Sequence, residues 1–176
     1  MPRIIATDRP PLRLVETAST QEVEWSWFCG RCAAPAPDNE PPAPNSRVCP
    51  SCGFGLLLEG RSDSVPGRRD AFMVIDSSLL VQGVSPAAET LLGVDEASAV
   101  NRPVQELLVP ADAETQGPSR FAAAVAEVMG VDEPVAIFVR PWNTFGVRMR
   151  VKIAPCGPPR AALLIIDQGP RTLRAV

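Results

Sequence analysis

The sequence predicts an α+β fold with five strands and four helical segments, preceded by a small cysteine-rich module. Two observations carry this prediction. Two strands, four helical segments and three strands follow one another between residues 70 and 168, and two Cys-x2-Cys pairs lie within residues 29–52. Of the 176 residues, 45% are apolar and 21% are charged, which is typical of a globular protein and excludes wholesale disorder.

The elements of the larger module follow from hydrophobic patterning and from capping residues. Ser85 is the expected N-cap of a helix that begins at Pro86 and ends before Gly93. Phe145, Val147, Met149, Val151 and Ile153 alternate with polar or small residues, which predicts a half-buried strand. The expected strands are 71–76, 79–83, 134–140, 144–154 and 161–167, and the expected helical segments are 86–92, a short turn from 95, 103–108 and 121–129.

Four cysteines predict a metal site. Two thiolates separated by two residues in a tight turn can face one ion, and two such turns complete a tetrahedron. The expected ligands are Cys29, Cys32, Cys49 and Cys52. We expect a structural zinc ion, because the surrounding residues contain too few apolar side chains for a core of their own. Iron is the alternative, since the turn from Cys49 to Gly53 suits both metals.

Residues 25–57 resemble a rubredoxin-type zinc ribbon, a resemblance that predicts a site but no particular activity. Trp25, Trp27 and Phe28 predict a short strand that covers the metal. The first turn has Ala33 where the second has Gly53, so it departs from the ideal geometry. The proline-rich residues 33–48 predict an extended, weakly ordered loop.

The larger module resembles a PAS domain. The residues that show this resemblance run from Phe72 to Leu108. They include the helix start Ser85-Pro-Ala-Ala and the turn Asn101-Arg-Pro103, where the family often has Gly-Arg-Pro. The resemblance implies a five-stranded antiparallel sheet with helices on one face, and a sensory or interaction role. It also implies a cavity between the sheet and the helices. The alternative is that the side chains lining it simply pack as a core and fill this space. Its expected lining is Met73, Leu92, Leu108, Phe121, Val125, Ile137, Val139 and Met149.

Several cofactors and activities are not expected. The chain has no histidine, which excludes Ser-His-Asp and Cys-His catalysis and His-ligated haem. The stretch from Asn101 to Val104 lacks the reactive cysteine of flavin-binding PAS domains. The scattered carboxylates Asp95, Glu96, Asp132 and Glu133 lie at predicted turns and helix starts, where they serve as caps or solvated charges. We therefore expect no haem, no flavin and no enzyme activity.

Charge and hydropathy bear on partners and location. The net charge is −3, and residues 21–60 contain five acidic and two basic residues, so direct nucleic-acid binding is not expected. No apolar run approaches the roughly 18 residues needed to span a membrane. The first nine residues lack the apolar core of a secretory signal, so we expect a cytoplasmic protein with no membrane contact.

The expected organisation is a flexible lead-in (1–20), a four-cysteine ribbon (21–59), a linker (60–69), the PAS module (70–168) and a tail (169–176). Cys156 is expected in a loop that joins two strands. The favoured function is a signalling adaptor. Its PAS module senses a small apolar ligand or forms a homodimer, and its zinc ribbon docks a partner protein. The alternatives are a transcription-linked regulator that acts through the ribbon, and an electron carrier with iron.

Overall fold

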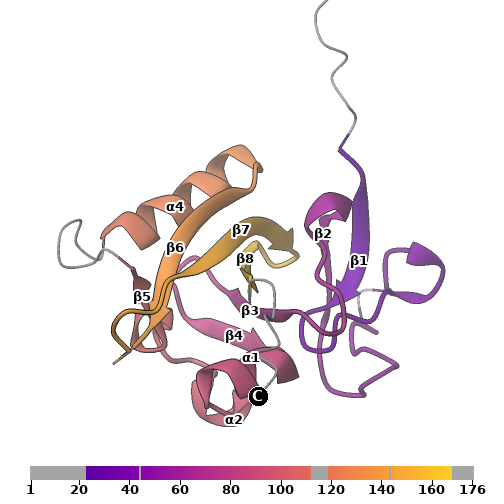
Figure 1. The fold of residues 1–176 in the computed structure, drawn as a ribbon. Coiled ribbons are helices and arrows are strands. Elements are labelled where there is room, and N and C mark those ends of the chain that lie inside the picture. Colours follow the sequence, from indigo (N-terminus) through magenta and orange to yellow (C-terminus); the bar gives the residue numbers. More distant parts are fainter. Residues whose placement is uncertain (1–22, 44, 112–118, 143, 168–176) are drawn as a thin grey trace, which may run out of the picture.

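The computed structural model describes residues 23–43, 45–111, 119–142 and 144–167. The predicted lead-in and tail lie outside these ranges. An eight-stranded antiparallel sheet runs in the order β1-β2-β7-β8-β3-β4, with β6 also paired to β7 and β5 paired to β6 (Figure 1). The strands are β1 (Trp25–Cys29), β2 (Leu57–Arg61), β3 (Ala71–Ile75), β4 (Val81–Val84), β5 (Leu108–Pro110), β6 (Val135–Pro141), β7 (Met149–Gly157) and β8 (Ala161–Asp167).

Two helices begin at the capping residues that the sequence predicts. Helix α1 (Pro86–Leu92) starts at Ser85, whose hydroxyl accepts a hydrogen bond from the amide of Ala88, and it stops at Gly93 with a φ of 65°. Helix α2 (Glu96–Ala99) is capped by Asp95. The predicted segment 103–108 is only a 3₁₀ turn, η3 (Val104–Glu106), which leads into β5. Helix α4 (Ser119–Val131) extends two residues beyond the expected 121–129 at each end, and so continues through Gly130, where it was expected to end.

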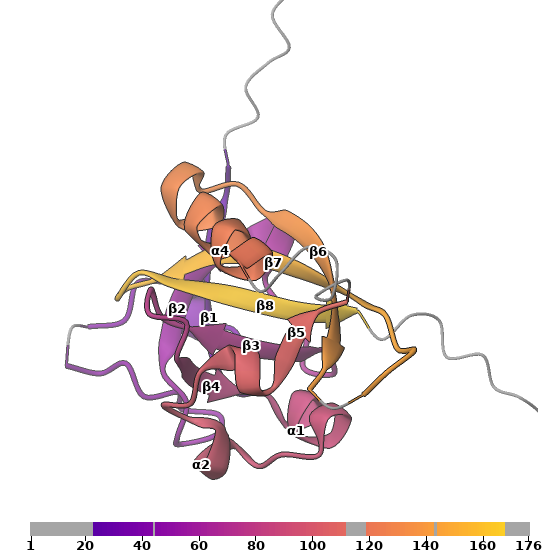
Figure 2. The same ribbon diagram turned by 90° about the vertical axis from the view of Figure 1, so that its left-hand side faces the viewer.

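All of these helices cover one face of the sheet, which we call the inner face. Alternate residues of β3, β7 and β8 point to this face, among them Met73, Ile153 and Leu164, and pack against α1, α2 and α4. Figure 2 shows α4 lying across the sheet on this side. Six of the eight predicted cavity residues are buried in this core, and Leu92 and Met149 are partly buried against it.

The opposite, outer face of the sheet is covered by the N-terminal hairpin. Phe28, Ala33 and Leu58 from the cysteine-rich module form one buried cluster with residues of β3, β7 and β8. The sheet residues of this cluster are Phe72, Val74, Cys156, Ala161 and Leu163. The cysteine-rich module and the PAS-like sheet are therefore packed together.

The hairpin also continues the sheet. Glu59 and Gly60 of β2 pair with Gly157 and Cys156, on the edge of β7 whose other half pairs with β6. Gly60 and Arg61, which the sequence analysis assigned to the linker, belong to β2. A Cβ atom at Gly60 would lie 2.9 Å from Cε1 of Phe28, so the close packing of this ring requires glycine.

Strand β7 starts five residues later than expected and ends three residues later. The alternation from Phe145 to Ile153 predicted a strand over 144–154, whereas β7 is Met149–Gly157. Its pairing with β6 begins at Met149, which lies opposite Val139, so Phe145 and Val147 precede the strand and are exposed. Cys156 lies inside β7 and not in a loop. The sheet has eight strands where five were predicted, because β1, β2 and β5 join it.

Candidate metal centre

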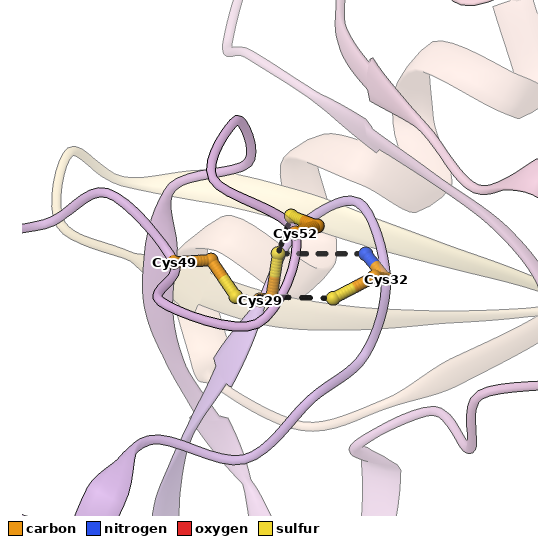
Figure 3. A group of neighbouring side chains, drawn as sticks. All are labelled: Cys29, Cys32, Cys49 and Cys52. Carbon is orange, nitrogen blue, oxygen red and sulfur yellow. Dashed lines mark hydrogen bonds between the residues drawn. The ribbon is translucent and has the colours of Figure 1, made fainter.

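Four cysteine side chains converge where β1 ends and the connection to β2 begins (Figure 3). The Sγ atoms of Cys29, Cys32, Cys49 and Cys52 all lie within 4.8 Å of one another. The Sγ atoms of Cys29 and Cys52 are 3.7 Å apart, and those of Cys32 and Cys49 are 3.8 Å apart. A tetrahedral site with metal–sulfur bonds of about 2.3 Å has edges of about 3.8 Å, so the four cysteines fit one ion.

The two cysteine turns have the same backbone geometry. In the first, the amide of Ala33 donates to the carbonyl oxygen of Cys29 at 3.0 Å, and in the second the amide of Gly53 donates to that of Cys49 at 2.8 Å. Ala33 has a φ of 56° and Gly53 a φ of 66°. Ala33 therefore adopts the left-handed conformation that favours glycine, and the first turn keeps the geometry despite its sequence.

Backbone amides point at the sulfur atoms. The amides of Arg31 and Cys32 donate to Sγ of Cys29 at 3.4 Å, and that of Gly55 donates to Sγ of Cys52 at 3.3 Å. Desolvation raises the pKa of Cys29 and of Cys32. Desolvation opposes ionisation of Cys52 too, but amide donation from Gly55 and Phe54 lowers its pKa to about 6. A bound cation would favour the thiolate form of all four.

A small apolar cluster surrounds the sulfurs. Trp27, Ala34, Ala36 and Leu57 are buried against Cys29 and Cys49, so β1 covers the site through Trp27 alone. Of the other two aromatic residues predicted to cover it, Phe28 packs in the cluster on the sheet and Trp25 is exposed. The proline-rich loop contains a 3₁₀ turn, η1 (Pro37–Asn39), so the prediction that it is extended throughout is wrong. Its described part is also tied to the free edge of β1, because the amide of Cys29 donates to the carbonyl of Ala34 and that of Ala36 to the carbonyl of Trp27. These bonds satisfy an edge that would otherwise be open.

One residue between the ligands connects the centre to the helices. Arg31 Nε lies 2.5 Å from Oε2 of Glu96, a residue that is only 8% exposed. The other carboxylate oxygen of Glu96 accepts the amide of Val84 at the end of β4, at 3.1 Å. The amide of Glu96 in turn donates to Glu89 at 2.7 Å. The first cysteine turn is thereby fixed to β4, α1 and α2.

Glycines allow this close approach. A Cβ atom at Gly83 of β4 would lie 3.1 Å from the carbonyl oxygen of Gly30, which follows the first ligand. A Cβ atom at Gly30 would lie 3.0 Å from Cδ1 of Leu58 and 3.5 Å from Cγ2 of Val74. The first cysteine turn thus lies directly on the outer face of the sheet.

The remaining candidate residues have structural roles. Asp95 caps α2, as predicted, with its carboxylate accepting the amide of Ser98. The expectation that Glu96 is a cap or a solvated charge is wrong, because it is buried and bound to Arg31. The exposed Asp132 forms an ion pair with Arg160. Burial raises the pKa of Cys156 to about 12, which disfavours a reactive thiolate.

Sequence reasoning missed Arg31 and Glu96 as partners. Their 65-residue separation leaves no local signal. The only indication was a charged residue placed between two metal ligands.

Within the described residues, no helix is long and apolar enough to cross a membrane.

No protein-family model and no curated protein matches the sequence. The PAS domain of nitrogen regulation protein NR(II) from Vibrio parahaemolyticus is similar over 56% of this chain and 87% of its own, with 15% identity and a TM-score of 0.42. A PAS domain from Colwellia psychrerythraea is similar over 56% of this chain and 84% of its own, with 21% identity and a TM-score of 0.45. The PAS domain of an HTR-like protein from Haloarcula marismortui has 20% identity and a TM-score of 0.39, over 56% of this chain and 84% of its own. Similarities of this degree carry no information about ligands, partners or activity.

Proposed function

We propose that this chain is a non-catalytic regulatory adaptor in which a structural zinc ion holds a docking element on the outer face of a PAS-like sheet. The observation that supports this most is the pairing of Arg31, a residue between two ligands, with the buried Glu96. A centre fixed in this way can hold the hairpin in one position against the sheet. We expect the adaptor to act in the cytoplasm and through protein contacts.

The wholly buried inner core supports protein contacts over ligand sensing. Met73, Leu108, Phe121 and Val139 are 0% exposed and lie in one packed cluster. A ligand between sheet and helices would have to displace such side chains, whereas the cysteine-rich module carries the exposed apolar side chains of Phe54 and Leu56.

Native mass spectrometry of protein purified without added metal, compared with its denatured mass, tests the metal. We expect one zinc ion per chain and no absorption in the visible range. An iron ion that cycles reversibly between two oxidation states would overturn the proposal in favour of the electron carrier.

Crosslinking in the source cells tests the adaptor role. The metal-bound protein should capture a discrete partner protein or a second copy, and the Cys49→Ser variant should lose that capture. Capture of neither by the metal-bound protein would contradict an adaptor. Capture of nucleic acid would favour the transcription-linked regulator.

A further inference from the structure

A cleft of about 870 Å³ lies between the cysteine turns and the body of the protein. Arg31, Phe54 and Leu56 line it from the cysteine turns, and Leu58, Val74 and Ala161 from the outer face of the sheet. The opposite wall comes from α1, α2 and the segment between them, including Glu89, Asp95 and Ala97. Its size lies within the range typical of binding sites.

The cleft combines acidic and apolar surface. Four acidic residues line it, Asp76, Glu89, Asp95 and Glu96, and two basic ones, Arg31 and Arg160. Both bases already have carboxylate partners, at 2.5 Å and 2.7 Å. A zinc ion with four thiolates adds about two negative charges next to the cleft. The surface therefore favours a basic occupant.

Exposed apolar side chains at the mouth of the cleft favour an occupant that is also apolar. Phe54 is 71% exposed and Leu56 is 52% exposed, although both follow a metal ligand in a well-defined turn. The Phe54 ring also offers an aromatic face, with the Arg31 guanidinium 5.3 Å from its centre. Apolar side chains held out in this way are typical of surfaces that bind another chain.

We propose that residues 9–15 of this same chain, Arg-Pro-Pro-Leu-Arg-Leu-Val, bind in this cleft. Two arginines without an acidic residue complement its charge, and Leu12, Leu14 and Val15 complement its apolar surface. Two consecutive prolines restrict this segment to extended conformations, which lowers the entropy lost on binding.

The chain is long enough for this contact. The described residues start at Val23, and the seven residue steps from there to Gly30 beside the cleft span at most about 24 Å. The eight steps from Val23 back to Val15 can span about 27 Å, so the segment can return along β1 to the cleft.

The inference deepens the proposed function and rests on it, because the metal centre holds the wall that carries Arg31 and Phe54. It also states what a docking partner must carry. A partner that uses this cleft presents the same basic and apolar chemistry and displaces residues 9–15.

Backbone ¹⁵N relaxation in the full, zinc-bound chain tests the proposal. We expect order parameters above about 0.8 for Leu12, Arg13, Leu14 and Val15, and values below about 0.6 in the Phe54→Ser, Glu89→Gln and Arg13→Glu variants. Glutamine at 89 keeps an acceptor for the amide of Glu96 and removes only the charge. Phe145→Ser is the matched control, since Phe145 is 78% exposed outside the cleft and its loss should leave the segment ordered.

Three results would overturn the proposal. One is a mobile segment in the zinc-bound wild-type chain, which leaves the proposed function intact. Another is an ordered segment that none of the three variants loosens. The last is order that disappears on dilution, which would show that a second copy supplies the segment. If the purified chain held no metal ion, that result would instead overturn the proposed function, and this proposal with it.

Discussion

The two faces of the sheet are covered by different means. The inner face packs against α1, α2 and α4 in one large cluster of buried apolar side chains. The outer face is covered by a hairpin with two five-residue strands, whose own contribution to the shared cluster includes Phe28, Ala33 and Leu58. A two-stranded hairpin is marginal by itself. Burial accounts for the inner face, whereas the outer cover also has the ion pair between Arg31 and Glu96 and four cysteines that could hold a metal ion.

Metal removal should break this comparison most strongly. We expect Cys49→Ser or a chelator to unfold the hairpin and expose Phe72, Val74 and Leu163, because metal binding supplies about 10–16 kcal/mol in small zinc modules. Hydrogen exchange should rise in β1 and β2 and stay slow in the inner parts of β3 and β8. Acidification should have the same effect, since protonated thiols release the ion.

The matched control for the metal site is Cys156→Ser. Cys156 is buried in β7 but is not among the four converging cysteines, so this variant should keep its zinc. Protected β1 and β2 amides in metal-free Cys49→Ser would contradict the prediction. Cooperative melting of the whole chain would show that hairpin and body form one folding unit.

Two large-to-small substitutions sharpen the comparison. Phe121 and Phe28 are both 0% exposed, one in the inner and one in the outer cluster, and each change to Ala should cost about 3–5 kcal/mol. Phe121→Ala should lower the global free energy of unfolding in urea. Phe28→Ala should mainly weaken zinc affinity in a chelator competition, because Phe28 precedes a ligand. Equal effects of both variants on zinc affinity would refute this distinction between the inner and the outer cluster.

The ion pair between Arg31 and Glu96 should contribute less. Loss of Glu96 leaves the amide of Val84 without its acceptor, so we expect Glu96→Ala to cost about 1–3 kcal/mol. A double-mutant cycle with Arg31→Gln should give a coupling energy of about 0.5–3 kcal/mol. The exposed pair of Arg102 and Glu106 is the control, with an expected coupling of about 0.3–0.5 kcal/mol. A coupling no larger than the control would mean that the connection is not energetically significant.

The smallest effect concerns the two left-handed residues of the cysteine turns. Ala33→Gly should relieve about 1 kcal/mol of backbone strain and lose a similar amount from a buried methyl group, so thermal unfolding should change little. Gly53→Ala should destabilise by about 1–2 kcal/mol, although nothing lies within 4 Å of the added Cβ atom. A stable Gly53→Ala variant would show that the conformation is not needed there.

Local signals in the sequence predicted several elements well. Ser85 and Gly93 gave the exact bounds of α1, because capping depends on neighbouring residues alone. The spacing of Cys29, Cys32, Cys49 and Cys52 predicted a cluster for the same reason, since each turn is local. The predicted start of β7 was wrong. The alternation of apolar residues begins at Phe145, but the pairing of β7 with β6 begins only at Met149.

The sequence by itself determined the four-cysteine cluster, the bounds of α1, and eight residues that lie in or against the inner core. Only the tertiary structure decided that the hairpin lies on the outer face, that Gly60 belongs to a strand and that Arg31 reaches Glu96. Caps, turns and periodicities arise between residues close in the chain, so they can be read in order. The burial of Phe28 in one cluster with Val74 and the pairing of Arg31 with Glu96 join distant residues, whose proximity depends on the folded sheet.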